Sequence, residues 1–225
     1  MKPTETLARE RTPEGDELVL SRRDGAYSLS IGGQELMTSR VHGSEEALAR
    51  LACAAIAEKK TPRVLVGGLG FGYTLRAALD HLPRGAAVVV CEVFASLLGW
   101  NRGLLADLAG RPLEDRRVRA VHADVRSLLD RRESPQRFDA ILLDVDNGPE
   151  AFTLRSNHSL YTAEGLDRLW RSLTVRGVLA VWSSTPSPEF QRRLRKAGFE
   201  AKAESVPTRQ GGKRRDTIFL GLRRR

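Results

Sequence analysis

The order of apolar and polar residues divides the chain into an alternating N-terminal part and a longer part of buried strands and helices. Three short segments alternate apolar with polar positions, at residues 17–23, 26–31 and 34–40. Asp24-Gly25 and Gly32-Gly33 separate these segments, and such pairs are typical of tight hairpin turns. The pattern therefore predicts a small β-meander over residues 17–43, preceded by a flexible polar tail over residues 1–16.

Residues 44–225 follow the pattern of helices that alternate with buried strands. A helix is predicted from Ser44 to about Lys59. Five apolar runs rich in β-branched residues predict strands that are covered on both faces, at 63–67, 87–92, 118–122, 139–144 and 177–183. Helical patterns lie between and after them, near 72–82, 94–109, 125–131, 162–173 and 188–197, and a final hairpin is predicted over 199–206 and 216–222. This order predicts an α/β fold with a doubly wound, mostly parallel seven-stranded sheet in a Rossmann-like domain over residues 44–225.

A glycine-rich loop joins the first of these strands to the following helix. It contains Gly67, Gly68, Gly70 and Gly72, where the backbone can pass close to a ligand and the helix N-terminus presents free N–H groups. Glu92 ends the next strand, where an acidic side chain can accept hydrogen bonds from both ribose hydroxyls. Strand, loop, helix and spacing together predict an adenosine-binding site. The alternative is a tight strand–helix turn with a surface glutamate.

Asp124 follows the third strand and extends this site. Its carboxylate can accept a hydrogen bond from the exocyclic amine of adenine, and it can equally cap the helix that begins at Val125. Two carboxylate oxygens allow both roles at once. The loop lacks the third glycine of dinucleotide sites and nothing matches GxxxxGK[ST], so a nucleoside triphosphate is not indicated.

The fourth strand ends in the most unusual stretch of the sequence, Asp144-Val145-Asp146-Asn147-Gly148-Pro149-Glu150. Side chains repeat their direction every second residue along a strand, so Asp144 and Asp146 point the same way if the strand continues. Paired carboxylates hold a cationic amine and can remove its proton once one pKa is raised by the other. We expect Asp144 to act as the base, with Asp146 and Glu150 holding the cation. A strand end followed by a Gly-Pro turn is the structural alternative.

The order of these motifs resembles the spermidine synthase family of aminopropyltransferases. The resemblance covers about residues 24–223 and rests on the β-meander, the helix after it and the segments VLVGGLGFGYTLRAAL, VVVCE, HADVRSLL, FDAILLDVDNGP, SLYTAEGLDRLWRSL and RGVLAVWS. It implies a class I methyltransferase fold with a small N-terminal β domain.

The resemblance also implies roles for individual residues. An adenosyl sulfonium would lie on the glycine loop, with Glu92 on its ribose and Asp124 at its adenine. Asp144 corresponds to the family's base, and Tyr161 falls in the family's segment at the entry to a helix. An amine acceptor and a homodimer are further implications.

Three departures from the family pattern bear on the chemistry. The family's loop reads GGGDGG, in which the aspartate binds the amine of the aminopropyl donor, whereas this sequence has Gly70 there. The family's acidic pair is spaced D-x-x-D-P, whereas Asp144 and Asp146 are separated by one residue. Residues 41–46, VHGSEE, replace a tyrosine-histidine-glutamate segment. The donor is therefore expected to be S-adenosylmethionine or its decarboxylated form.

These features lead to one leading hypothesis and two rivals. The leading one is a spermidine-synthase-like transferase that moves an aminopropyl or related group from an adenosyl sulfonium to a small-molecule amine. The rivals are an S-adenosylmethionine-dependent methyltransferase on the same fold and a non-catalytic protein that binds an adenosyl ligand.

Composition and charge narrow the other function classes. The net charge is +9, which is typical of proteins that bind nucleic acid. However, 31 of the 37 basic residues are arginines spread along the chain, and no aromatic residues alternate with them as in proteins that bind single strands. Nucleic acid is therefore not expected as a partner. Two cysteines are too few for a fold held together by disulfide bonds. No pair of the four histidines has the spacing of metal ligands, so no metal is expected. No apolar run approaches the length of a membrane span and no secretory signal is recognisable, so a cytoplasmic protein is expected.

Overall fold

The computed structural model describes residues 3–12, 15–129, 137–145, 148–149, 155–209 and 211–224. The chain divides into two compact units, Met1–His42 and Gly43–Arg225.

The first unit is an antiparallel sheet in the order β1-β2-β3-β4, with strands β1 (Glu5–Arg11), β2 (Glu17–Arg23), β3 (Ala26–Ile31) and β4 (Gln34–Thr38). The turns predicted at Asp24-Gly25 and Gly32-Gly33 are confirmed, since all four residues have positive φ, as type I′ hairpins require. The prediction of a flexible tail over 1–16 is wrong for β1, which pairs with β2. β1 is polar because it is an edge strand, held by main-chain bonds and by ion pairs such as Arg9 to Glu17 at 2.8 Å.

The second unit contains the predicted seven-stranded, mostly parallel sheet. Its strands are β5 (Arg63–Gly67), β6 (Ala87–Glu92), β7 (Val118–His122), β8 (Phe138–Leu143), β9 (Leu173–Ser183), β10 (Glu200–Pro207) and β11 (Arg215–Leu222). They are ordered β10-β11-β9-β8-β5-β6-β7, with β11 antiparallel to both of its neighbours and the other pairs parallel. The predicted fold class, a doubly wound and mostly parallel seven-stranded sheet, is therefore confirmed.

Six α-helices and two 3₁₀ segments are described around this sheet: α1 (Gly43–Ala54), α2 (Tyr73–His81), α3 (Ala95–Arg102), η1 (Pro112–Glu114), α4 (Val125–Leu129), η2 (Arg155–Tyr161), α5 (Ala163–Ser172) and α6 (Pro188–Lys196). Two helices end earlier than predicted. α1 gives way after Ala54 to tight turns in which Ala55 and Ile56 donate to carbonyls three residues earlier. α3 ends at Gly103, whose backbone leaves the helical region.

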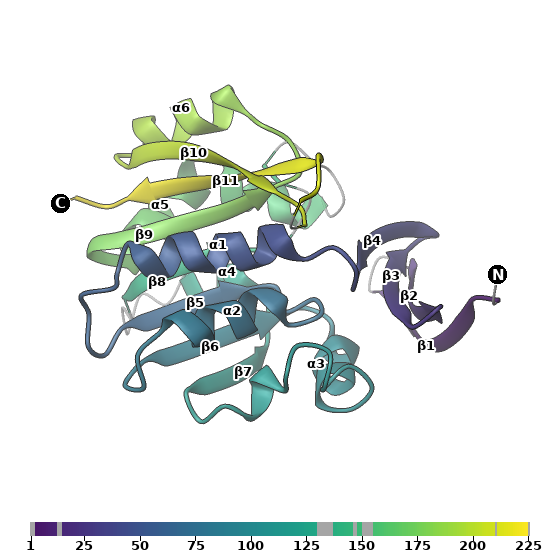
Figure 1. Ribbon diagram of the computed structural model, residues 1–225. Coiled ribbons are helices and arrows are strands. Elements are labelled where there is room, and N and C mark those ends of the chain that lie inside the picture. The colour runs from purple at the N-terminus through teal and green to yellow at the C-terminus, as the bar shows by residue number, and fades with distance from the viewer. Residues whose placement is uncertain are drawn as a thin grey trace. The chain divides into compact units, whose positions relative to one another are not determined.

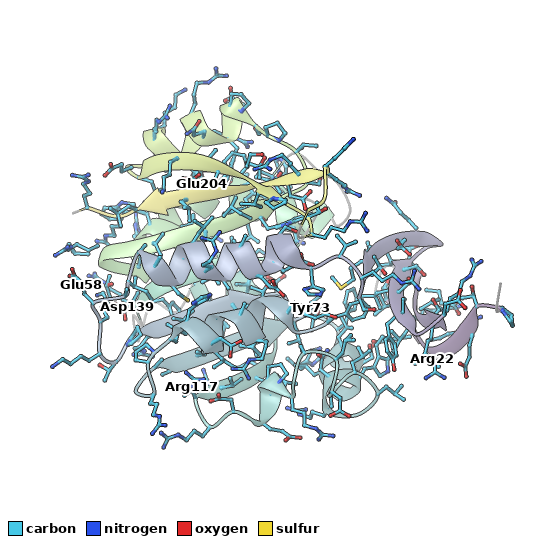
Figure 2. All side chains as sticks on the ribbon, in the orientation of Figure 1. Arg22, Glu58, Tyr73, Arg117, Asp139 and Glu204 are labelled. Atoms are coloured by element: carbon cyan, nitrogen blue, oxygen red, sulfur yellow. The ribbon has the colours of Figure 1, made fainter. Side chains whose placement is uncertain are left out.

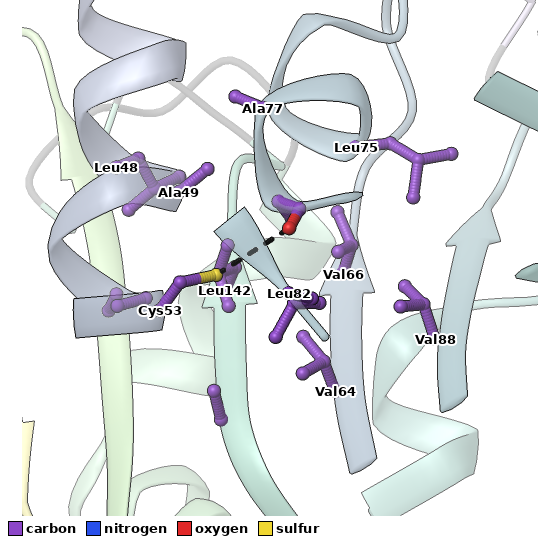
Figure 3. Packing of buried hydrophobic residues seen from close by; sticks show 14 of the residues in the cluster. Leu48, Ala49, Cys53, Val64, Val66, Leu75, Ala77, Leu82, Val88 and Leu142 are labelled. Carbon is purple, nitrogen blue, oxygen red and sulfur yellow. Dashed lines mark hydrogen bonds between the residues drawn. The ribbon is translucent and has the colours of Figure 1, made fainter. Parts of the chain in front are cut away.

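Alternate residues of each central strand enter two separate cores. In β8, Ala140 and Leu142 face the core that α1 and α2 cover, whereas Ile141 and Leu143 face the core of α4, α5 and α6. This period of two makes a three-layer unit, with helices on both faces of the sheet (Figure 1). Figure 3 shows the first core, where the buried Cys53 thiol of α1 approaches the Ala78 carbonyl of α2. Burial raises the pKa of this thiol to about 12.

The strand order creates a switch point beside β5. From β5 the chain continues to β6 and β7 on one side, and β8 and β9 lie on the other. Ligands of such sheets bind outside the carboxyl ends of the strands at this point. Figure 2 shows Tyr73, which opens α2, at that end of the unit, and Asp139, near the start of β8, at the opposite end.

Candidate functional site

The glycine loop runs between the ends of three parallel strands. The Gly68 N–H donates to the Cys91 carbonyl at the end of β6, and the Asp144 N–H donates to the Gly67 carbonyl from the end of β8. Gly68 has φ +88, and a Cβ at this position would lie 2.1 Å from the Asp144 carbonyl oxygen. Gly68 is therefore required by the close approach of this chain's own backbone, as well as by any ligand.

Asn101 holds the loop from the side of α3. Its buried side-chain amide donates to the carbonyl of Gly70 at 2.9 Å and to that of Leu97 at 2.9 Å. Gly70 has φ +50 and Gly72 has φ +87, which are conformations that glycine adopts without strain. A Cβ at Gly72 would lie 3.2 Å from the Asn101 Oδ1 atom. The loop is thus set by packing against α3, a contact that the glycine pattern alone does not reveal.

Asp144 lies directly after β8, beside the start of α2. Its Oδ2 accepts a hydrogen bond from the Thr74 hydroxyl at 2.6 Å, and Thr74 is itself buried. Burial raises the pKa of Asp144 to about 6 against the opposing effect of the Thr74 hydrogen bond, and the charges of Asp216 and Glu92 act in the same direction as burial. A carboxylate with this pKa can take up a proton near neutral pH.

Two further carboxylates lie close to Asp144. Glu45, in the first turn of α1, accepts a hydrogen bond from the Ser44 hydroxyl at 2.8 Å. Burial, followed by repulsion from Asp144, raises the pKa of Glu45 to about 8. Asp216, near the start of β11, is 3% exposed, and burial raises its pKa against hydrogen bonding to Ser44 and the charge of Arg214. The site is therefore strongly acidic on the side of α1 and β11.

Glu92 lies where the sequence predicted, at the end of β6, but its carboxylate is turned toward the glycine loop. Oε2 accepts from the Leu69 N–H at 2.9 Å and Oε1 accepts from the Phe94 N–H at 3.0 Å. Burial raises the pKa of Glu92 against these backbone hydrogen bonds. The backbone N–H groups of Val93 and Gly70 also lower the pKa of Glu92, so the carboxylate is engaged mainly by this chain's own loop.

Asp124 lies two residues beyond the end of β7 and binds Arg126. The Asp124 carboxylate accepts from the Arg126 backbone N–H at 2.8 Å, which caps α4, and from its guanidinium through Nε at 2.9 Å. Burial would raise the pKa of Asp124, but the hydrogen bonds of Arg126 outweigh it and the pKa is lowered. Arg126 also donates to the Ser159 hydroxyl at 3.0 Å. The capping role is thus present, and the carboxylate is shared with an arginine that the sequence reasoning did not include.

Three predicted residues remain to be considered: Asp146, Glu150 and Tyr161. Asp146 and Glu150 lie outside the described residues. Tyr161 is 2% exposed and belongs to the second core, where its ring packs edge-on against Phe190 with centroids 5.5 Å apart. A catalytic role for Tyr161 therefore stays a prediction.

Short contacts fix the described parts of the segment after β8. The buried Asn157 side chain donates to the Val145 carbonyl at 3.1 Å. Gly148 has φ +112, and a Cβ there would lie 2.2 Å from the Ser183 Oγ atom at the end of β9. This glycine lets the chain pass tightly against β9.

The sequence reasoning missed three polar residues of this site: Thr74, Glu45 and Asp216. Thr74 follows the glycine loop directly, and a hydroxyl at the start of that helix is the only signal that pointed to it. Glu45 lies in the first turn of α1, where interaction with the helix dipole already accounts for an acidic residue. Asp216 opens the last strand and carried no signal, since pairing of β11 with β9 is what brings it to this end of the sheet.

The described residues offer neither a metal site nor a membrane-spanning helix. Among them, no group of three or more histidine, cysteine, aspartate or glutamate residues is arranged to hold a metal ion. No helix in the described part of the chain has both the length and the apolar character needed to cross a membrane.

The fold of this chain is similar to that of known proteins, although its sequence is not. No protein-family model and no curated protein sequence matches this chain. Solved structures do match: a spermidine synthase from Thermotoga maritima (TM-score 0.76, 18% identity, 97% of this chain and 73% of that one) and a spermidine synthase in complex with the transition-state analogue AdoDATO (TM-score 0.75, 18% identity, 97% and 72%). A probable spermidine synthase from Corynebacterium glutamicum matches with TM-score 0.63, 19% identity, and coverage of 99% and 81%. At these identities the similarity establishes a shared fold.

The close approach at Gly68 gives a test of the loop geometry. Gly68→Ala should lower the free energy of unfolding by about 2–5 kcal/mol, because it combines a left-handed backbone (about 1–2 kcal/mol) with overpacking against Asp144 (about 1–3 kcal/mol). Gly211→Ala is the matched control, since Gly211 has φ +71 and open space around a Cβ, and it should cost about 1–2 kcal/mol. Urea unfolding followed by tryptophan fluorescence measures both. Equal losses would contradict the contact with Asp144.

Proposed function

We propose that this protein is a transferase that moves an aminopropyl group from an adenosyl sulfonium to an amine, at the carboxyl ends of β5 and β8. The observation that carries the proposal is the Asp144 carboxylate, which lies at the switch point beside the glycine loop, holds the Thr74 hydroxyl and has a pKa raised to about 6. The shared fold with spermidine synthases, one of them holding AdoDATO, supports the same reaction class.

The residues on the donor side fit an adenosyl group in their hydrogen-bonding chemistry. Glu92 is held at the glycine loop by the Leu69 and Phe94 N–H groups, and its carboxylate oxygens are the acceptors that the ribose hydroxyls would use. Asp124 can accept from an adenine amine while Arg126 holds its carboxylate in place. When bound, the donor supplies a carbon that its positive sulfur already activates toward a nucleophile. The donor is S-adenosylmethionine or its decarboxylated form.

The chain itself must supply proximity and an amine freed of its proton. An ammonium that binds at Asp144 transfers one proton to this carboxylate. The amine nitrogen then forms a bond to the activated carbon as the carbon–sulfur bond breaks, and the electron pair of that bond stays on sulfur. Thr74 engages Oδ2, so the orientation of the carboxylate is fixed during the proton transfer.

The decisive experiment measures product formation in Asp144→Asn. Loss of the base should lower the rate of transfer by about 10²–10⁴-fold, the usual contribution of a general base. Asp80→Asn is the control, because Asp80 is an exposed carboxylate at the far end of α2, and it should leave the rate unchanged. Mass spectrometry identifies the products: a methylated acceptor would support the methyltransferase instead, and no product with either donor would support a non-catalytic binder.

The hydrogen bond from Thr74 makes the pH profile a further test. The ionised form of Asp144 is the base, so kcat/KM should fall as the pH drops below about 6. The Thr74 hydroxyl stabilises the ionised form, so Thr74→Val should raise the pKa of Asp144 and move this acid limb to higher pH. Thr74→Ser keeps the hydroxyl and should keep the limb in place. If kcat/KM falls at the same pH in Thr74→Val as in the wild type, Asp144 is not the group that takes up the proton.

The choice of donor follows from Gly70. An aspartate at this position, as in the loop of the family that the sequence resembles, would attract a donor ammonium and repel the carboxylate of S-adenosylmethionine. A charge contact at ~4 Å with an effective dielectric of 20 is worth about 4 kcal/mol before screening and desolvation. The wild type should therefore bind both donors with similar affinity, and Gly70→Asp should favour the decarboxylated one by about five-fold or more. Calorimetric titration measures this. A wild-type preference above about a hundred-fold for the decarboxylated donor would contradict it.

A further inference from the structure

The excess positive charge of the protein is concentrated at the C-terminal end of the chain. Residues 188–225, which contain α6, β10 and β11, hold 12 of the 37 basic residues but only 4 of the 28 acidic residues. This segment therefore carries +8 of the net charge of +9, and residues 1–187 are close to neutral. Figure 1 shows the segment, coloured green to yellow, at the edge of the sheet that β10 forms.

Several exposed arginines outside this segment pair with a carboxylate nearby on the chain. Arg111 pairs with Asp107 at 2.7 Å, and Arg171 pairs with Asp167 at 2.8 Å. Three carboxylates inside the segment are used in the same way, in the ion pairs Glu189 with Arg192, Glu200 with Arg224 and Glu204 with Lys202. These carboxylates are therefore engaged on the surface of α6 and β10.

The turn between β10 and β11 carries cations that lack such partners. We call residues 208–214 the basic turn. Its Arg209, Lys213 and Arg214 side chains are exposed and form no ion pair with a carboxylate of the described residues. The charge of Arg214 acts on Asp216, but Asp216 is buried, and burial raises its pKa despite that charge. The like charges of the basic turn therefore repel one another without a surface carboxylate to offset them.

The backbone of the basic turn is fixed by hydrogen bonds. The Thr208 N–H donates to the Arg214 carbonyl at 3.1 Å, and the Gly212 N–H donates to the Arg209 carbonyl at 2.9 Å. The Gly43 N–H at the start of α1 donates to the Thr208 carbonyl at 2.8 Å, and a Cβ on Gly43 would lie 3.0 Å from that same oxygen. The fold therefore holds these cations together at one place on the surface.

The basic residues of α6 have a structural explanation that the basic turn lacks. Arg193, Arg195 and Lys196 lie in the last turn of α6, where cations interact favourably with the helix dipole. The basic turn joins two strands, and its hydrogen bonds are made by backbone groups that any residue provides. Its cations are therefore the part of the segment that points to an anionic partner.

The aromatic residues of the segment limit the kind of anion. They are Phe190, Phe199 and Phe219, and all three are buried, at 0%, 3% and 1% exposure. Proteins that bind single-stranded nucleic acid stack its bases on exposed aromatic rings, which this surface does not offer. A duplex keeps its bases stacked inside and presents a regular array of phosphates outside, so cations alone suffice to bind it.

We propose that the basic turn binds the phosphate backbone of a nucleic-acid duplex, without regard to base sequence. Each cation that approaches a phosphate releases counterions, and this release supplies the free energy of binding. The expectation from composition, which did not include nucleic acid, weighed the arginines over the whole chain and the lack of aromatic residues between them. The charge excess is local, and binding to a duplex needs no stacking. The inference is independent of the proposed transferase function.

The experiment measures fluorescence anisotropy of labelled duplexes of about 20 base pairs, one of DNA and one of RNA, with the full chain at roughly 50 and 200 mM NaCl. Three phosphate contacts give a slope of log K against log salt of about −2.7, so the affinity of the wild type should fall about 40-fold or more over this range. Binding of either duplex with this salt dependence supports the proposal, and the comparison shows which helix is preferred.

The double variant Arg209→Gln with Lys213→Gln removes two of the cations and leaves Arg214, which acts on Asp216, in place. It should reduce the magnitude of the salt slope by about 2 and lower the affinity at low salt about ten-fold or more. Arg84→Gln with Arg116→Gln is the matched control, because both arginines are exposed, lie before β6 and β7 and form no ion pair with a described residue. The net charge changes equally, but the control should keep the wild-type slope.

Four results would overturn the inference. They are binding of neither duplex, an equal loss in the control variant, tighter binding of a single strand of the same length than of the duplex, and binding of phosphatidylserine vesicles without binding of either duplex. The last would assign the basic turn to a membrane surface. Asp144→Asn should bind the duplex as tightly as the wild type, so failure of the transfer reaction and failure of duplex binding are observed separately.

Discussion

The main-chain contact between the ends of β5 and β8 is the constraint on which the site depends. The Asp144 N–H donates to the Gly67 carbonyl, and Gly68 passes so close to Asp144 that no side chain fits between them. This contact exists because β5 and β8 are neighbours at the switch point of the sheet. It places the start of α2, and hence Thr74, beside the carboxylate of Asp144. The Asp144 carboxylate is therefore positioned by backbone geometry.

Around this contact the fold gathers carboxyl groups whose ionisation is opposed by burial. Asp144, Glu45 and Asp216 all have pKa values raised first of all by burial. A carboxyl group whose pKa is higher in the folded than in the unfolded state binds more protons when folded, so its contribution opposes folding as the pH rises above about 4. Stability at neutral pH therefore rests on the two apolar cores, which offset the cost of this acidic cluster.

The opposite end of the sheet shows how the same residue type is used for stability. Asp139 accepts from the Arg63 N–H at 2.8 Å and from the Thr174 hydroxyl at 2.8 Å, and it pairs with Lys59 at 2.7 Å. Burial would raise the pKa of Asp139, but these partners outweigh it and the pKa is lowered. Asp216 differs from Asp139, because its Oδ1 atom has no donor among the described residues and its pKa is raised rather than lowered.

Local pattern was sufficient for the parallel strands, the glycine loop and the strand ends at Glu92 and Asp144, because covered strands read as apolar runs and glycine marks positive φ. Pattern failed for β1, where main-chain pairing orders a polar segment, and for the early ends of α1 and α3. Only the tertiary structure could bring Asp216 to Glu45, since their meeting requires antiparallel pairing of β11 with β9 and a hairpin tied to α1. Hydrophobic periodicity reports which face of an element is buried, whereas contacts between polar side chains depend on which elements become neighbours.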